Sequence, residues 1–236
     1  MQYLLIPSNM YIHFHVIGMF PRSIESYLKK SIVGRAQKSG AIEVSYYSLL
    51  DYAENSAEGT LPQRVDAKPY GGGPGMVLKA KPVMDAITDA VGRKKNVTYV
   101  HFAPRAEKFT NQIARGIKEQ SLAKKNAVRD VVIICGRYEG IDSRINEIYS
   151  GLTVSIGDYV LSGGELAAAV VVDTVTRQLP GVLGDADSLE EDRKDASSKY
   201  YAKPECIDYK KKKYCVPEVL RSGNHAEIER WRQRHN

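Results

Sequence analysis

The stretch Val131-Val132-Ile133-Ile134-Cys135-Gly136-Arg137-Tyr138-Glu139-Gly140-Ile141-Asp142 places a continuous apolar run directly before a turn that contains two glycines. An apolar run without alternation is typical of a strand covered on both faces, as in a parallel sheet. Ligands of open α/β sheets bind outside the carboxyl ends of such strands, so this turn is well placed for a binding site. The alternative is an ordinary strand-to-helix turn in which Asp142 caps the helix.

Strands and helices alternate on both sides of this run. The apolar periodicity predicts strands over 11–17, 41–47, 97–102 and 152–156. It predicts helices over 23–30, 82–91, 111–119 and 165–179. This alternation is typical of an α/β fold with a largely parallel sheet.

The composition excludes several classes of protein. The chain has 236 residues, of which 43% are hydrophobic and 26% charged, so it is neither disordered nor fibrous. No apolar run approaches the roughly 20 residues of a membrane helix, and we recognise no signal peptide. Three cysteines without a C-x-x-C pair predict a reducing cytoplasm, with neither a disulfide framework nor a zinc site.

The character of the chain changes after Pro180. Six acids against two bases over 185–195, with almost no apolar residue, predict a linker that cannot pack. The run Lys210-Lys211-Lys212-Lys213 and a predicted basic helix over 226–234 follow it. The net charge of +6 is compatible with a polyanionic partner, although many basic proteins bind none. We place the domain boundary at this linker.

Two further glycine motifs accompany the turn after Cys135. The string Pro69-Tyr70-Gly71-Gly72-Gly73-Pro74-Gly75-Met76 lacks the pattern of a phosphate or dinucleotide loop, so a plain flexible loop and a ligand loop are equally supported. The string Ser155-Ile156-Gly157-Asp158-Tyr159-Val160-Leu161-Ser162-Gly163-Gly164-Glu165 follows the next predicted strand. Two glycine turns after two strands predict one shared pocket, whose main chain contacts a flat purine.

Other polar residues have plain interpretations. Asp173 and Arg177 lie four apart on one predicted helix, which favours a surface ion pair. His13 and His15 share one strand face without an evident third ligand, so packing is favoured over metal binding. Composition and spacing alone therefore lead to a ligand-binding α/β protein with a basic tail.

The motifs taken together carry a resemblance. With Pro180-Gly181-Val182-Leu183-Gly184 and Ser222-Gly223-Asn224-His225-Ala226-Glu227-Ile228, they resemble the bacterial tRNA (guanine-N1)-methyltransferases, in the same order from about Ile12 to Arg232. That family belongs to the SPOUT superfamily. The resemblance implies a parallel sheet with a deep C-terminal trefoil knot, plus a small helical C-terminal domain. It implies a methyltransferase domain over 10–182, a flexible acidic linker over 183–203 and a basic tRNA-binding domain over 204–236 that is short for the family.

The resemblance also implies an activity. The family transfers a methyl group from S-adenosylmethionine to N1 of the guanine at tRNA position 37, 3′ of the anticodon, giving 1-methylguanosine. It works in the cytoplasm as a homodimer whose subunits share each active site. Mg²⁺ is implied by similarity alone, because the sequence shows no metal-ligand spacing.

Site residues follow by motif position. The catalytic residues implied are Asp192, as the base for the N1 proton, and Arg177, as the cation near O6. The implied cofactor residues are His101, Phe102, Ala103, Pro104, Gly136, Tyr138, Glu139, Ile156, Gly157, Asp158, Tyr159, Val160, Leu161, Gly163 and Gly164. The tRNA phosphates would meet the basic side chains of the tail, namely Lys210, Lys211, Lys212, Lys213, Arg221, Arg230, Arg232 and Arg234.

The chain departs from the family pattern in places. The segment over 61–68 lacks the usual His/Arg-rich string, and Ala167 replaces a usual proline. The family pattern starts near Met10, which leaves the place of residues 1–9 open. Two rivals remain, a non-catalytic RNA-binding protein and a SPOUT relative that acts on rRNA or on another tRNA position. Asp192 and Arg177 argue against the first rival, and the string over 222–228 argues against the second.

Overall fold

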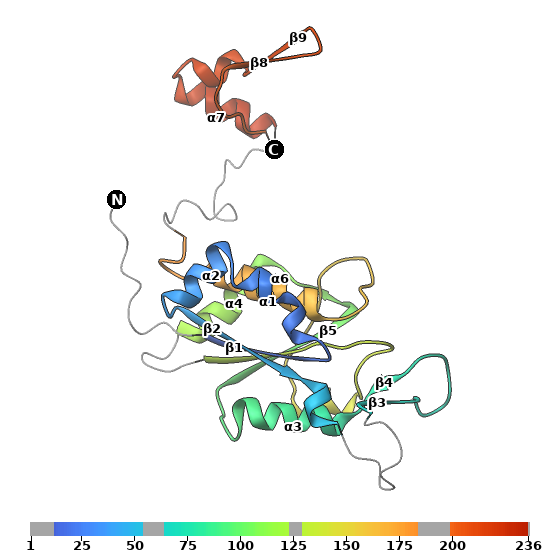
Figure 1. Ribbon diagram of the computed structural model, residues 1–236. Helices are drawn as coiled ribbons and strands as arrows, with labels where there is room; N and C mark the ends of the chain where they lie inside the picture. The colour runs from blue at the N-terminus through green and yellow to red at the C-terminus, as the bar shows by residue number, and fades with distance from the viewer. Residues whose placement is uncertain (1–11, 54–63, 123–128, 184–198, 236) are drawn as a thin grey trace. The chain divides into compact units, whose positions relative to one another are not determined.

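The computed structural model describes residues 12–53, 64–122, 129–183 and 199–235 (Figure 1). The chain divides into two compact units, Met1–Ala186 and Asp187–Asn236. Each unit is described below by itself. Among the described residues, no helix is both long and apolar enough to cross a membrane.

A five-stranded parallel sheet forms the centre of the first unit. Its strands lie in the order β2 (Ile42–Ser48), β1 (Ile12–Gly18), β6 (Arg129–Ile134), β5 (Val97–Lys108) and β7 (Leu152–Ser155). Every neighbouring pair is parallel, which confirms the predicted α/β class. The continuous apolar run forms β6, the middle strand, because both of its faces are covered.

Helices cover both faces of this sheet (Figure 1). On one face lie α1 (Glu25–Leu28), α2 (Ser31–Lys38), α4 (Asn111–Leu122) and α6 (Glu165–Arg177), and the 3-10 turn η1 (Pro21–Ile24) precedes α1. On the other lie α3 (Ala80–Val91) and α5 (Arg144–Ile148), with the 3-10 turn η2 (Leu49–Tyr52).

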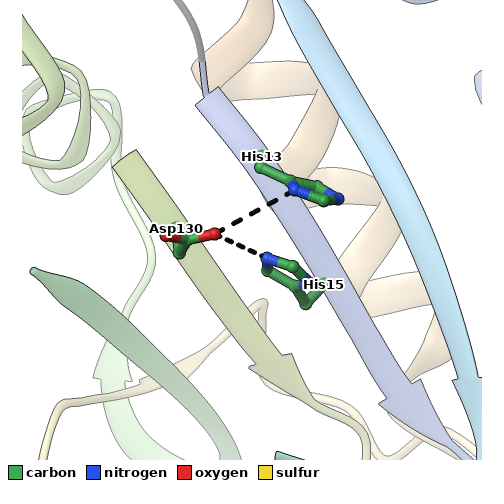
Figure 2. Close-up of side chains that lie close together, drawn as sticks. All are labelled: His13, His15 and Asp130. Carbon is green, nitrogen blue, oxygen red and sulfur yellow. Dashed lines mark hydrogen bonds and ion pairs between the residues drawn. The ribbon is translucent and has the colours of Figure 1, made fainter. Parts of the chain in front are cut away.

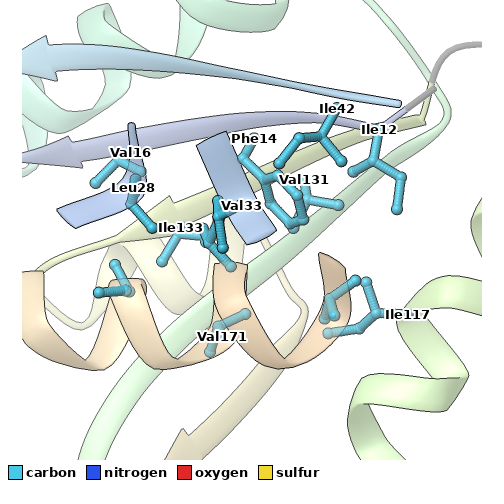
Figure 3. Packing of buried hydrophobic residues seen from close by; sticks show 14 of the residues in the cluster. Ile12, Phe14, Val16, Leu28, Val33, Ile42, Ile117, Val131, Ile133 and Val171 are labelled. Carbon is cyan, nitrogen blue, oxygen red and sulfur yellow. The ribbon is translucent and has the colours of Figure 1, made fainter. Parts of the chain in front are cut away.

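Alternate side chains of the strands enter the two cores. Phe14 and Val131 pack with Val33 and Val171 in the larger core (Figure 3). The next residue of β6, Val132, enters the core beneath α3. This alternation follows from the period of two along a strand. Fully burying one such aliphatic or aromatic side chain contributes about 1.5–3 kcal/mol.

Several elements differ from those that the periodicity predicts. The helix predicted over 23–30 is η1 followed by the single turn of α1, and α2 is an additional helix. Gly34 weakens the helical signal of α2, yet a Cβ at this position would lie 2.2 Å from the carbonyl oxygen of Lys29. Close approach of the two helices therefore requires the glycine. The short strands β3 (Asp66–Ala67) and β4 (Val77–Leu78) are also additional to the predicted ones.

The second unit contains a hairpin as well as helix. The strands β8 (Cys206–Tyr209) and β9 (Lys212–Cys215) pair antiparallel, followed by η5 (Glu218–Arg221) and α7 (His225–Arg234). The turn residues Lys210 and Lys211 both have positive φ, 46° and 62°, as two-residue hairpin turns require. The described part of this unit is therefore mixed rather than purely helical.

A disulfide joins the two ends of this hairpin. Cys206 and Cys215 are register partners, with their Cα atoms 4.1 Å apart, and their sulfurs are bonded. The prediction of no disulfide is wrong for this pair, because an odd cysteine count does not prevent two cysteines from meeting across paired strands. Cys135 is the buried free cysteine of the described residues.

Candidate active site

A cavity of about 440 Å³ lies at the carboxyl ends of β5, β6 and β7. This volume falls in the range of small-molecule sites, about 300–1,000 Å³. The ladder between β5 and β7 is interrupted between Phe102 and Glu107, so residues 103–106 leave the sheet beside the cavity. The predicted cofactor residues that line it are His101, Phe102, Ala103, Pro104, Gly136, Tyr138, Glu139, Ile156, Tyr159, Val160, Leu161, Gly163 and Gly164.

Two glycine-bearing loops of the cavity are joined by their backbones. The Gly164 N–H donates to the Gly136 carbonyl at 2.9 Å, and Arg137 forms an isolated antiparallel bridge with Gly163. A Cβ on Gly164 would lie 2.8 Å from the Cα of Cys135. The absence of a side chain at Gly164 therefore lets the two loops approach closely. Both loops line the one cavity, as the two glycine turns predict.

Arg137 and the buried Glu165 form a partly exposed ion pair beside the cavity. The Arg137 guanidinium donates through Nε and Nη2 to the two carboxylate oxygens of Glu165, at 3.1 and 3.2 Å. The backbone N–H of Phe20 donates to the same carboxylate at 3.2 Å. The Phe20 ring lies 4.8 Å from the Arg137 Cζ atom. Sequence reasoning missed this pair, because residues 28 positions apart in the chain show no shared pattern.

His101 presents an unpartnered nitrogen among the residues that line the cavity. Its Nε2 lies 2.8 Å from the carbonyl oxygen of Tyr149. A carbonyl only accepts, so Nε2 carries the proton and Nδ1 is an acceptor. This Nδ1 is buried and has no hydrogen-bond partner among the described residues. Burial lowers the pKa of His101 below its usual 6.5, although the bond to Tyr149 opposes this.

Comparison with protein families decides the identity. The family model described as tRNA (Guanine-1)-methyltransferase TrmD matches residues 12–236. The chain belongs to the tRNA (guanine-1)-methyltransferase family. This finding confirms the resemblance read from the glycine motifs.

Individual relatives agree with the membership. A tRNA (guanine-N(1)-)-methyltransferase of Lachnospira eligens is 44% identical over 225 residues, covering 93% of this chain and 87% of the relative. One of Thermomicrobium roseum is 39% identical over 225 residues, covering 94% and 78%. The solved tRNA (m1G37) methyltransferase of Aquifex aeolicus is similar with a TM-score of 0.68 and 35% identity, over 95% of this chain and 88% of that one.

Two residues expected at the cofactor of a tRNA (guanine-1)-methyltransferase do not line the cavity. Asp158 has a largely exposed side chain and accepts from the Lys108 ammonium at 2.6 Å. Gly157 has φ of 155°, and a Cβ there would lie 2.4 Å from the Tyr159 ring. Gly157 therefore supports the wall indirectly, since it leaves space for Tyr159, whose hydroxyl donates to the Ile156 carbonyl at 3.1 Å.

The loop over 69–76 lies outside the cavity lining. Its residues Gly71, Gly72, Gly73 and Gly75 all have positive φ, which explains why glycines occupy these positions. The carbonyl of Met76, at its end, accepts from the Glu139 N–H at 3.1 Å. The loop thus supports a cavity-lining segment, and the choice between a plain loop and a ligand loop stays open.

The catalytic residues implied for the family are not brought to the cavity within the described part of one chain. Arg177 is half-buried at the last residue of α6, whereas Gly164, directly before that helix, lines the cavity. Ala167, in the first turn of α6, also lines the cavity, and the ten residue steps from it to Arg177 span about 15 Å. Asp192 and the acidic stretch over 185–195 lie outside the described residues. The side chain of Asp173 accepts from the Tyr27 hydroxyl at 2.5 Å.

A second polar cluster lies at the opposite end of the sheet. His13 and His15 on β1 meet Asp130 on β6 (Figure 2). The expectation that the two histidines have no third ligand is wrong, because the pairing of β1 with β6 sets Asp130 opposite His13. Burial lowers the pKa of His13 to about 4 and also lowers that of His15.

Proposed function

We propose that the protein transfers a methyl group from S-adenosylmethionine to N1 of guanine 37 in tRNA, giving 1-methylguanosine. One observation carries the proposal for the cofactor: all the residues predicted to hold it, except Gly157 and Asp158, line one cavity. Family membership supports the reaction class and the substrate. A related enzyme acting elsewhere on RNA remains the second candidate.

The residues of the cavity fit this cofactor. The side chains of Val154, Ile156 and Leu161 offer apolar walls for a purine. The unpartnered Nδ1 of His101 offers a buried acceptor for an N–H or O–H group. The carboxylate of Glu139 offers negative charge to a cationic ligand. When bound, S-adenosylmethionine supplies a methyl group that its sulfonium activates, so no covalent enzyme intermediate is needed.

Two side chains complete the chemistry on the base. Asp192 accepts the N1 proton, and Arg177 opposes the negative charge that develops at O6 as this proton leaves. An unperturbed aspartate, with a pKa of about 3.9, is a weak base for this proton. The reaction therefore depends on the arginine and on a site closed to water.

A homodimer brings these groups together. Within one chain, ten residue steps of α6, about 15 Å, separate Arg177 from the cavity-lining Ala167. We place Arg177 of one subunit at the cavity of the other, so that each active site is shared. A trefoil knot formed by the cavity loops is also proposed, and the bond between Gly164 and Gly136 agrees with their close association.

Mg²⁺ has no fitting set of ligands among the described residues. The one group of three potential ligands found there contains two imidazoles, whereas Mg²⁺ takes oxygen ligands. No step of the mechanism is therefore routed through this ion.

The second unit is proposed to hold the tRNA. The hairpin turn presents lysines beside exposed tyrosines, with the Lys210 and Lys212 ammonium groups 5.3 and 5.1 Å from the rings of Tyr209 and Tyr214. Ammonium groups bind phosphates, and aromatic rings stack on unpaired bases. Binding of tRNA is proposed to order the linker over 183–203 and to bring Asp192 to the base. The reaction takes place in the cytoplasm, where tRNA is used.

The proposal is tested by separating cofactor binding from methyl transfer. Equilibrium dialysis with labelled S-adenosylmethionine measures binding, and a single-turnover assay with excess enzyme measures transfer to tRNA. Asp192→Asn should abolish transfer and leave binding nearly intact. Loss of both together contradicts its role as the base. Mixing Asp192→Asn with Arg177→Ala subunits provides the matched test of sharing: a mixed dimer recovers one active site only if Arg177 and Asp192 reach that cavity from different subunits.

A further inference from the structure

The cluster of His13, His15 and Asp130 is not used by the proposed reaction. All three lie on the face of the sheet that packs under α3, near the amino ends of β1 and β6 (Figure 2). The cavity begins at Gly136, six residues further along the chain from Asp130. At about 3.3 Å per residue this places Gly136 about 20 Å from Asp130. On β5, the cavity-lining His101 lies four residues, about 13 Å, beyond Val97, the register partner of Asp130.

We propose that His13, His15 and Asp130 bind one divalent transition-metal ion, with Zn²⁺ preferred. The inference does not depend on the proposed function. One ligand atom from each residue lies within 4.8 Å of the others. His15 and Asp130 are buried, and the side chain of His13 is 17% exposed, which leaves a path from solvent.

The distances suit three ligands of one ion. The Nε2 of His15 lies 2.9 Å from Asp130 Oδ1, and the Nδ1 of His13 lies 4.0 Å from the same oxygen. Ligands at about 2.0–2.2 Å from a tetrahedral zinc lie roughly 3.4 Å apart. A shift of about half an ångström in each of these two distances therefore brings both histidines to a spacing from Asp130 that suits the ion. The rings of His13 and His15 already lie side by side, with centroids 3.9 Å apart.

The remaining ring nitrogens have outer partners. The Nε2 of His13 lies 2.8 Å from the Ser45 hydroxyl oxygen, and the Nδ1 of His15 lies 3.2 Å from the Tyr47 hydroxyl oxygen. A metal-bound imidazole donates its second N–H to such a partner, which orients the ring. A hydroxyl both donates and accepts, so Tyr47 can accept from His15 once the ring proton moves from Nε2 to Nδ1 and Nε2 is free to bind the metal.

Two charged side chains, Lys94 and Glu43, lie beside the three proposed ligands. The Lys94 ammonium lies 3.0 Å from Asp130 Oδ1, where it occupies the position that a cation would take. Its side chain is 54% exposed, so it can turn into solvent. The Glu43 carboxylate lies 3.8 Å from the His13 Nε2 and adds negative charge at the rim. Tyr99, on β5, also faces Asp130.

The donor set selects the kind of ion. Two imidazole nitrogens and one carboxylate oxygen suit Zn²⁺, Co²⁺ or Ni²⁺, whereas Mg²⁺ prefers oxygen ligands alone. Three protein ligands leave the fourth position of a tetrahedral zinc to water. An ion at this place joins β1 to β6 and stabilises the sheet, and none of its three ligands lines the cavity.

The test is a titration of chelator-treated full-length protein with Zn²⁺, followed by calorimetry, with Co²⁺ as a spectroscopic probe. We expect one Zn²⁺ per chain and no comparable binding of Mg²⁺. His13→Gln and Asp130→Asn should each weaken Zn²⁺ binding at least tenfold. Lys94→Gln should strengthen it, because the competing ammonium is removed. The matched control His225→Gln, on α7, should bind Zn²⁺ like wild type.

Other results overturn the proposal. No Zn²⁺ binding by wild type shows that these residues form no metal site. Equal losses in His225→Gln and His13→Gln show that Zn²⁺ binds the protein nonspecifically. If Asp130→Asn fails to fold, the Lys94→Gln variant tests the same carboxylate oxygen, because the replaced side chain is exposed. Unchanged affinity in Lys94→Gln contradicts competition between this ammonium and the ion for Asp130 Oδ1. Cobalt absorption that persists in His13→Gln excludes that imidazole.

Discussion

The carboxylate of Glu165, at the first residue of α6, accepts two hydrogen bonds from the guanidinium of Arg137, at 3.1 and 3.2 Å. This pair joins the loop after β6 to the start of the helix whose other end carries Arg177. It therefore connects the wall of the cavity to the element that bears the proposed catalytic arginine.

Loss of this pair should affect stability and cofactor binding together. Arg137→Ala leaves a carboxylate with a side chain only 4% exposed and without its cation, so the free energy of unfolding should fall by about 3 kcal/mol. S-adenosylmethionine affinity should fall as well. Urea unfolding and equilibrium dialysis measure the two effects. Lys108→Ala, which breaks the exposed pair with Asp158, should cost less than about 1 kcal/mol.

The glycine contact between the loops gives a second prediction. Gly164→Ala places a Cβ 2.8 Å from backbone at Cys135, so it should destabilise by about 1–3 kcal/mol and weaken cofactor binding. Gly116→Ala is the control, because nothing lies within 4 Å of its Cβ position in α4. That variant should be stabilised by about 0.5–1 kcal/mol. Equal effects at both glycines contradict the close packing of the loops.

The buried imidazole of His101 predicts a pH dependence. Its pKa is lowered in the folded protein, so the unfolded chain binds more protons as the pH falls below 6.5. The free energy of unfolding should therefore decrease on acidification through this range. His13 adds a change of the same sign between 6.5 and about 4.

The measurement compares urea unfolding at pH 7 and pH 5. His101→Gln should lose less stability than wild type over this interval, and His225→Gln should behave as wild type does. If the free energy of unfolding of His101→Gln falls between pH 7 and pH 5 as much as that of wild type, this imidazole does not contribute to the pH dependence. His101→Gln should also bind S-adenosylmethionine more weakly, because it removes the Nδ1 acceptor that has no partner among the described residues.

The lysines of the hairpin should contribute to tRNA affinity through phosphates. Replacing Lys210, Lys211, Lys212 and Lys213 by Gln should weaken tRNA binding. The slope of log affinity against log salt should fall by about 1 for each phosphate that the variant no longer neutralises. Cofactor binding in the first unit should not change. An unaltered salt slope removes the hairpin from the tRNA interface.

The sheet is largely predictable from the sequence, because local patterns determine its strands. The unbroken apolar run of β6 indicates a strand covered on both faces, and the glycines after it indicate the cavity. The hairpin escapes the same reasoning because each of its strands has only four residues and contains lysine or aspartate among the apolar side chains. The run Lys210-Lys211-Lys212-Lys213 indicates only charge, although two of these residues form its turn.

Contacts between distant residues are beyond prediction from such patterns. Asp130 meets His15 across 115 positions, and only the pairing of β1 with β6 brings them together. Arg137 and Glu165 meet for the same kind of reason, since two loops end at one edge of the sheet. The roles of Arg177 and Asp192 come from the resemblance, and they stay predictions.

The central claim is tested most directly by labelled methyl transfer from S-adenosylmethionine to two tRNA transcripts. One transcript carries guanine at positions 36 and 37, and the other carries adenine at 37. The account predicts label on the first transcript alone, which digests to 1-methylguanosine. Equal labelling of both transcripts places the target elsewhere on tRNA, and no labelling of either, despite measurable cofactor binding, contradicts the proposed activity.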